Sequence, residues 1–593
     1  MERAAAGPFT VPDPGTGRDW LAAARSRLTG DPAAADVLDR LDALAADARP
    51  RVLVCGDYST GKSSLIRRLL VDAGLPVPED LSVAAGPETS TAKHYDLGDL
   101  VLVDTPGFQS GRDDHADRAR LSLPDAAAVL YLFSPNLVTG DREDLDLVLR
   151  GDPERHWPGK FDRTVLVLNR TDAVGPDPFD APEEFERLCR RKRLELATAI
   201  NAAADPRRPE AVPQVVPEQV VCVSADPYGL RGARAEDFAP YRHWDGTEAL
   251  REALAVLRRR ILVNGVDTAV LHGGLARFGA LHRDALDEER TARDRAAQFG
   301  RLHGDIADRL DDGRALKASR AARLTELVGE FVDRELTRTL RSTDPAEREV
   351  LAERLAAWAS NKDLHGIVEQ WWDESQRKTA EWRRDTAHTF RRSIGSAEFN
   401  RVFPDAGTVA SLHVFAGRSA PELRKKAAKG LGWLGTVVGK ADAKVISTVG
   451  VWLNRALDPA AVARGAVALA RLGAGLSVVA AAVDVYGLVR GTREDRELDR
   501  DRRAGIAALH EDAARWSEQA AWGTEAAPGP LRVLAADLDE LDAAVQGIAA
   551  RRDQYEQEAG LVRNRIDAYQ GVIDHAYTCL GRDPGAPTPG GTR

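Results

Sequence analysis

The segment that most constrains the fold is a glycine-rich octapeptide near the start of the chain. Residues Gly56–Ser63 read Gly-Asp-Tyr-Ser-Thr-Gly-Lys-Ser, which matches the pattern GxxxxGK[ST]. In that pattern the backbone N–H groups of a loop surround phosphate oxygens. The apolar run Arg51–Cys55 precedes it and the helical stretch Ser64–Leu70 follows it. The pattern in this context predicts a phosphate-binding loop between a strand and a helix.

Further apolar runs follow at intervals that leave room for helices, namely Leu100–Asp104, Ala127–Phe133, Thr164–Asn169 and Gln219–Val223. Nearly continuous apolar strands separated by helices indicate a mainly parallel sheet with helices on both faces. The stretch His94–Leu97 lies next to Gly98-Asp99 and is predicted to pair with Leu100–Val103 as a hairpin. The fold class of this part is therefore α/β.

The glycine-rich loop and the first residues after it are predicted to bind a nucleoside triphosphate. The residues are Gly56, Asp57, Tyr58, Ser59, Thr60, Gly61, Lys62, Ser63 and Ser64. The positive end of the following helix adds to the attraction for phosphate. Lys62 is expected to reach the β- and γ-phosphates, and the Ser63 hydroxyl is expected to ligate Mg²⁺.

The end of the second apolar run carries the sequence Asp104-Thr105-Pro106-Gly107, about 40 residues after the loop. An acidic residue at this place holds the ligand shell of Mg²⁺, so Asp104 is a predicted metal residue. The N–H of Gly107 is expected to sense the γ-phosphate, which would make the following loop a switch.

Two later strand ends are predicted to read the base as guanine. Asn169-Arg170-Thr171-Asp172 follows the fourth run and resembles the motif [NT]KxD, with Arg170 in place of the usual lysine. The Asp172 carboxylate can accept hydrogen bonds from guanine N1–H and the 2-amino group, whereas adenine offers neither donor. Asn169 is expected to join the base to the phosphate loop, and Arg170 to lie over the base. Ser224-Ala225-Asp226 follows the last run and is predicted to read the guanine O6 through a backbone N–H.

The remaining element of such a site is a threonine that closes over Mg²⁺ and the γ-phosphate. The segment Gly86–Thr91 lies between the phosphate loop and the Asp104 strand, where this residue belongs. Thr91 is preferred over Thr89 because it is closer to the strand His94–Leu97. Thr91 is thus both a predicted metal ligand and a predicted catalytic residue.

Four motifs in this order resemble GTPases of the translation-factor-related class, and closer features resemble the dynamin superfamily, especially bacterial dynamin-like proteins. The loop with its second serine, Ser64, is similar to the GxxxxGKSS form frequent in that family. Phe108 follows Gly107 directly, where small GTPases have their catalytic glutamine. The resemblance implies that loop residues position the attacking water, which makes Ser59, with Tyr58 beside it, a candidate catalytic residue together with Lys62. Tyr58 departs from the glutamine that some dynamins carry.

The strand pattern ends near Ile261, and the rest of the chain is predicted to be helical, with a large bundle or stalk and a hydrophobic tip. The layout resembles that of dynamins. The predicted divisions are N-terminal helices in a neck bundle (1–48), a GTPase domain (49–262), a helical stalk (263–425), a paddle-like hydrophobic tip (426–492), C-terminal helices returning to the bundle (493–580) and a disordered tail (581–593).

A heptad-like apolar stripe runs along the C-terminal helices. It comprises Leu531, Leu534, Leu538, Leu541, Val545, Ile548, Tyr555, Ala559, Val562, Ile566, Tyr569, Ile573, Ala576 and Leu580. Such a stripe buries one side of a long helix against partners. An intramolecular bundle is preferred over a free two-stranded coiled coil. Trp358, Trp371, Trp372 and Trp382 are predicted to be core anchors rather than a base-stacking platform.

The segment Gly430–Arg490 is rich in Gly, Ala, Val and Leu with scattered charges. It suits either a hairpin that contacts a bilayer or a buried helical pair at the tip of the stalk. No window reaches about 18 uncharged apolar residues, so no transmembrane helix is predicted.

Composition limits the remaining function classes. The net charge of -10 disfavours nucleic acid as a partner, because phosphate backbones attract clustered Lys and Arg. The four cysteines form no CxxC pair, and the N-terminus has no signal-peptide pattern, which favours a cytoplasmic protein, with a peripheral position at the inner face of the cell membrane as an extension.

The sequence therefore predicts a Mg²⁺-dependent GTPase that cycles between GTP and GDP. It is expected to form a homodimer or oligomer through its GTPase domains and to remodel membranes. The alternative is a soluble GTP-dependent switch or scaffold that acts on a protein partner without membrane insertion.

Overall fold

The computed structural model describes residues 12–56, 59–78, 81, 93–104, 122–136, 142–202, 214–342, 357–403, 495–525 and 528–582. The chain forms two compact units, the first from Met1–Asp287 with Val562–Arg593 and the second from Glu288–Leu561. Two long helices, α7 (Thr247–Ser342) and α18 (Pro530–Cys579), contribute residues to both units.

A six-stranded sheet forms the centre of the first unit, in the order β2-β3-β1-β4-β7-β8. Its strands are β1 (Arg51–Gly56), β2 (Lys93–Asp96), β3 (Val101–Asp104), β4 (Ala128–Phe133), β7 (Thr164–Asn169) and β8 (Val220–Val223). All neighbours pair in parallel except the edge strand β2, which forms the predicted hairpin with β3. The predicted parallel α/β fold is confirmed.

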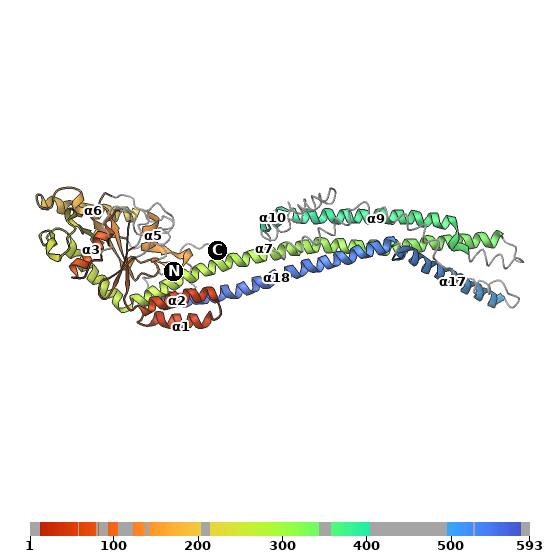
Figure 1. Cartoon of the computed structure of the whole chain (residues 1–593), viewed down its shortest axis with the longest axis horizontal. Helices are drawn as coiled ribbons and strands as arrows, with labels where there is room; N and C mark the ends of the chain where they lie inside the picture. Colours follow the sequence, from red (N-terminus) through yellow and green to blue (C-terminus); the bar gives the residue numbers. More distant parts are fainter. Residues whose placement is uncertain are drawn as a thin grey trace, which may run out of the picture. The chain divides into compact units, whose positions relative to one another are not determined.

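Helices cover both faces of this sheet (Figure 1), because alternate strand residues on each face are apolar. On one face, Leu53, Tyr131 and their neighbours pack against α5 (Arg142–Arg150) and α6 (Pro182–Ala202). On the other face, Val54 and Leu130 pack against α3 (Lys62–Asp72) and the beginning of α7. The carboxyl ends of the parallel strands thus meet at one edge.

Short elements connect these strands and helices. They are the two-stranded hairpin β5 (Gly151–Asp152) and β6 (Trp157–Pro158), and the 3-10 turns η1 (Pro153–Arg155), η2 (Phe161–Arg163), η3 (Thr171–Ala173), η4 (Pro217–Gln219), η5 (Pro227–Gly229) and η6 (Ala235–Tyr241).

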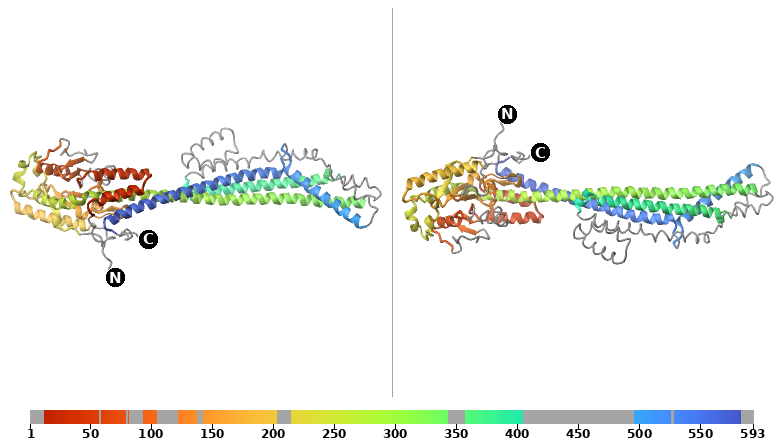
Figure 2. Two further views of the ribbon diagram at one scale, coloured as in Figure 1. Left: turned by 90° about the horizontal axis from the view of Figure 1, so that it is seen from below. Right: turned by 90° about the horizontal axis from the view of Figure 1, so that it is seen from above.

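A helical bundle completes the first unit. The N-terminal helices α1 (Thr16–Arg27) and α2 (Pro32–Ala46) pack against the early part of α7 and the last part of α18, and all views in Figures 1 and 2 show them side by side. Trp20 is buried in this bundle, and its indole N–H donates to the carbonyl of Val572 at 3.1 Å. Helix α1 and the last part of α18 are therefore held together by packing.

The second unit is helical in its described part. Its helices are the remainder of α7 and α18 together with α9 (Lys362–Ile394), α10 (Ala397–Val402) and α17 (Asp495–Trp522), and a 3-10 turn, η7 (Ala357–Ser360). The predicted stripe of α18 is buried along its whole length, against α7 and α9 here and against α1, α2 and α7 in the first unit. The intramolecular bundle, rather than a free coiled coil, is thus the arrangement observed.

The four tryptophans singled out from the sequence are core residues, with exposed fractions between 1% and 6%. The indole N–H groups of Trp371 and Trp382 donate to the carbonyls of Arg320 and Arg309 on α7. Their prediction as core anchors is confirmed.

The segment Gly430–Arg490 lies outside the described residues, so its two interpretations stay as predictions, as do the predicted domain boundaries. Among the helices of the described ranges, none combines the length and the apolar character needed to cross a membrane.

Candidate nucleotide-binding site

The glycine-rich loop connects the end of β1 to the start of α3, at the carboxyl edge of the sheet. Gly61 has a left-handed φ of 85°, and a Cβ at this position would lie 2.5 Å from the side-chain nitrogen of Asn169. Only glycine fits such a close approach. Gly61 is also the N-cap of α3, and it has no side chain that could occupy the first N–H groups of the helix. The start of α3 is thus suited to an anion.

The Lys62 side chain folds back across this loop. Its ammonium group donates to the carbonyl of Gly56 at 2.9 Å. The bond places the charge of Lys62 over the loop, on the side where the end of β3 lies.

A hydroxyl and a carboxylate meet beside Lys62. The Ser63 Oγ lies 3.5 Å from Oδ2 of Asp104, which is only 3% exposed at the end of β3. Burial raises the pKa of Asp104 to about 6, although Lys62 and the Ser63 hydroxyl both act to lower it. Because burial makes its negative charge costly, the Asp104 carboxylate would be stabilised by a nearby cation. These two oxygen ligands are of the kind that Mg²⁺ prefers, so the residues fit that ion.

Asn169 joins the three loops at this edge. It is fully buried, its amide nitrogen donates to the carbonyl of Thr60 at 2.9 Å, and its amide oxygen accepts from the N–H of Ala225 at 3.1 Å. The phosphate loop, the end of β7 and the loop after β8 are therefore held by one side chain.

Asp172 lies next to these groups at the start of η3. Its N–H donates to the Ser224 hydroxyl at 3.1 Å, and its carboxylate accepts from the N–H of Tyr228 at 2.8 Å. Arg170, in a left-handed conformation with φ of 63°, donates to the carbonyl of Ser59 at 3.0 Å. Arg170 therefore contacts the phosphate loop in this structure.

These contacts bring together Gly56, Ser59, Thr60, Gly61, Lys62, Ser63, Asp104, Asn169, Arg170, Asp172, Ser224 and Ala225, whereas Ser64 and Asp226 are adjacent to them in the sequence. The other predicted site residues, Asp57, Tyr58, Thr89, Thr91 and Gly107, lie outside the described residues.

Residues 51–170 match the family model MMR_HSR1, described as 50S ribosome-binding GTPase. The match begins at β1 and ends at Arg170, so it contains the phosphate loop, Asp104 and Asn169. The chain carries a P-loop GTPase domain. The prediction that it is a GTP hydrolase is confirmed.

The GTPase is also similar to solved structures at low identity. LeoA, a bacterial dynamin GTPase from ETEC, is 14% identical, with a TM-score of 0.30 and coverage of 95% of this chain and 97% of that one. A chain from an oligomerised bacterial dynamin pair, which provides a mechanism for long-range sensing and tethering of membranes, is 10% identical, with a TM-score of 0.37 and coverage of 95% and 94%. Toc33 from Arabidopsis thaliana is 16% identical, with a TM-score of 0.25 and coverage of 43% and 93%. No curated protein matches the sequence significantly.

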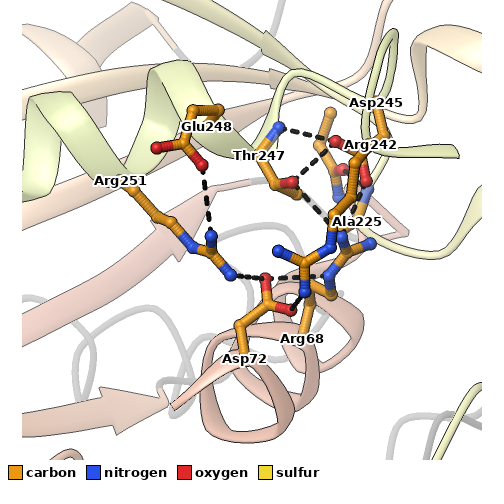
Figure 3. Close-up of polar contacts among 9 residues, drawn as sticks. Arg68, Asp72, Ala225, Arg242, Asp245, Thr247, Glu248 and Arg251 are labelled. Carbon is orange, nitrogen blue, oxygen red and sulfur yellow. Dashed lines mark hydrogen bonds and ion pairs between the residues drawn. The ribbon is translucent and has the colours of Figure 1, made fainter. Parts of the chain in front are cut away.

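The GTPase contains a buried ion-pair network behind the site that the sequence analysis missed (Figure 3). Arg68 of α3 is 1% exposed, and its guanidinium bonds to Asp245 at 2.7 Å and to Asp72 at 3.0 Å. It also donates to the Thr247 hydroxyl at 3.2 Å and lies over the ring of Phe238. An arginine among the apolar residues of a buried helix face was the one signal in the sequence.

Asp245 connects this network to the loop after β8, which begins at Ser224, and to the start of α7. Its backbone carbonyl accepts from the N–H of Ser224 at 2.9 Å. Its carboxylate accepts from the N–H and the hydroxyl of Thr247, at 2.9 and 2.6 Å, where α7 begins. On the outer side, Arg251 pairs with Asp72 and Glu248 (Figure 3). One set of polar contacts thus connects α3, the loop after β8 and the start of α7.

Proposed function

We propose that the GTPase binds GTP together with Mg²⁺ across the carboxyl edge of its sheet and couples hydrolysis to self-association in a dynamin-like cycle. The observation that carries the proposal is the convergence of three groups at this edge. The start of α3 with Lys62 suits phosphate, the Ser63–Asp104 pair suits a divalent cation, and Asp172 beside Asn169 suits guanine.

At the phosphate end, Lys62 offsets the charge of the β- and γ-phosphates. Its ammonium has three N–H donors, so it can keep its bond to Gly56 and still donate to phosphate oxygens. Ser63 and Asp104 would hold Mg²⁺, with Thr91 closing over it. When bound, Mg²⁺ supplies positive charge at the phosphoryl group. Ser59, with Tyr58 beside it, orients the attacking water.

At the base end, Asp172 accepts from guanine N1–H and the 2-amino group, and the backbone of Ser224-Ala225-Asp226 faces O6. Asn169 is bonded on both sides, to Thr60 and to Ala225, so the loops that would surround the base are joined before the base arrives. Such preorganisation reduces the entropy lost on binding.

Self-association follows from the incomplete catalytic machinery of one chain. Phe108 stands where small GTPases have glutamine, so a single GTPase domain is expected to hydrolyse GTP slowly. Pairing of two domains across the nucleotide would shield the γ-phosphate and fix the catalytic loops, which stabilises the charge that develops in the transition state. The phosphate loop, the Thr89–Thr91 loop and the Phe108–Asp114 loop would line that face, with Arg112 adding positive charge.

The bundle of α1, α2, α7 and α18 supports the dynamin-like layout. Its core joins α1, α2 and the last part of α18 to the early part of α7, which follows the GTPase sheet, as a neck bundle requires.

The test measures GTP turnover per molecule from nanomolar to tens of micromolar protein, with Lys62→Ala as the inactive control. We expect specific activity to rise with concentration. Sedimentation with GDP and aluminium fluoride, a transition-state mimic, is expected to show dimers that the nucleotide-free protein lacks. Flat turnover without dimers in the mimic would reject pairing and favour a soluble switch that awaits an external activator.

A membrane role is the second part of the proposal. The composition of Gly430–Arg490 supports peripheral contact with the inner face of the cell membrane. Co-sedimentation with liposomes, with and without GTP, tests it directly. Protein that stays in the supernatant in both cases would favour the scaffold that acts on a protein partner.

A further inference from the structure

Tyr228 has an uncommon backbone conformation next to the residue proposed to read guanine. Its φ is 52° and ψ is 20°, in the left-handed region, which a residue other than glycine adopts only when its surroundings impose it. In this conformation its N–H donates to Oδ2 of Asp172 at 2.8 Å. The strained backbone therefore delivers one hydrogen bond to one carboxylate.

The side chain of Tyr228 is held by a different set of contacts. Its hydroxyl donates to the carboxylate of Asp177 at 3.0 Å, and its ring stacks on Phe179 with an interplanar angle of 18°. The rings of Tyr241 and Trp244 lie within 6.0 Å of it, centroid to centroid. These contacts fix the position of the residue from both the ring and the hydroxyl.

Stabilisation of the core does not account for this cluster, because Tyr228 is 50% exposed and Phe179 is 49% exposed. The cluster instead joins two loops. Asp177 and Phe179 follow η3, which carries Asp172, whereas Tyr228 follows Ala225 in the loop after β8. Both loops belong to the base end of the site.

We infer that Tyr228 is a positioning residue for guanine recognition, which orients the carboxylate of Asp172 so that each of its oxygens faces one guanine donor. This inference rests on the proposed function of Asp172. A carboxylate can accept about four hydrogen bonds, so the bond from Tyr228 leaves room for guanine N1–H and the 2-amino group. A carboxylate free to rotate would still accept from N1–H but would read the 2-amino group less well.

The discriminating ligand is inosine triphosphate, which has the N1–H of guanine and lacks the 2-amino group. Dissociation constants of GTP and inosine triphosphate are measured by displacement of a fluorescent guanine nucleotide from the full-length protein. Tyr228→Phe removes only the hydroxyl bonded to Asp177, and Tyr228→Ala also removes the stacked ring. Tyr241→Phe is the matched control, since it deletes a hydroxyl from the same cluster at a residue that does not contact Asp172.

We expect the preference for GTP over inosine triphosphate to fall by about threefold in Tyr228→Phe and about tenfold in Tyr228→Ala, because each variant loosens the anchor that holds the backbone N–H of residue 228 against Asp172 and so weakens one charge-assisted hydrogen bond. The affinity for inosine triphosphate and the melting temperature should change little, which a purely structural role of the ring would not allow. The control should keep the wild-type preference.

The outcomes separate this inference from the function on which it rests. A wild-type protein without any preference for GTP over inosine triphosphate overturns both. A wild-type preference that both Tyr228 variants retain overturns the positioning role alone and leaves Asp172 as the reader of the base.

Discussion

Loss of Arg68 should cost the GTPase domain several kcal/mol of stability, because Arg68 neutralises a buried carboxylate. In Arg68→Met the buried carboxylate of Asp245, with a side chain 0% exposed, keeps its bonds from Thr247 on Oδ1 and loses its partner on Oδ2. Asp72 still has Arg251 and Arg242 nearby. Removal of one member of a buried ion pair typically costs about 3–5 kcal/mol, because the other charge stays buried without compensation.

Hydrogen exchange of β4 is the suitable assay, since this central strand is buried throughout and is therefore expected to exchange only when the domain unfolds. A cost of about 3–5 kcal/mol lowers its protection by roughly two to nearly four powers of ten. The control Arg187→Met removes two exposed ion pairs on α6, with Glu183 at 3.8 Å and Glu184 at 3.9 Å, and should cost less than about 1 kcal/mol.

The double variant Arg68→Met with Asp245→Asn tests the cause. Asparagine removes the stranded charge and keeps the oxygen that caps α7, so it should recover on the order of 1–3 kcal/mol. If the amides of β4 are as well protected from exchange in Arg68→Met as in Arg187→Met, the reasoning about the buried charge is wrong.

Three further predictions follow from single residues. Lys62→Ala should abolish triphosphate binding in a nucleotide titration, and undiminished affinity in a folded variant would remove the phosphate-loop assignment. Asp172→Asn should shift the preference towards xanthosine triphosphate, whose carbonyl replaces the amino group, and a retained GTP preference would mean that Asn169–Asp172 is not the guanine-reading segment. Burial lowers the pKa of Lys160 from 10.5 to about 7, so between these values the unfolded chain binds a proton that the folded chain lacks. The free energy of unfolding should therefore rise with pH across this window by up to about 1.4 kcal/mol per pH unit. Denaturant unfolding of Lys160→Met at several pH values should lack this rise. The same dependence on pH in the variant and the wild type would contradict the lowered pKa of Lys160.

Most of the features predicted from the sequence depend on local patterns. The phosphate loop, the strand ends at Asp104 and Asn169, and the stripe of α18 were evident because each depends on residues close together in the sequence. A buried strand is marked by an apolar run, and a buried helix face is marked by apolar residues at 3-4 spacing. Both signals are independent of which element packs against them. The choice between a bundle and a free coiled coil for α18 needed its partners, since the same stripe suits both.

The tertiary structure alone decided what depends on distant pairs. Arg68 meets Asp245 across 177 positions, and Tyr228 meets Asp172 across 56. The position of Arg68 among apolar helix residues indicates that it is buried, but no local spacing identifies its counter-ion, because that partner lies on a distant segment that only the fold brings close. The order of the six strands likewise depends on pairing between segments that are far apart in the sequence. The sequence by itself predicted which groups would bind phosphate and base, and the fold showed which residues hold those groups in place.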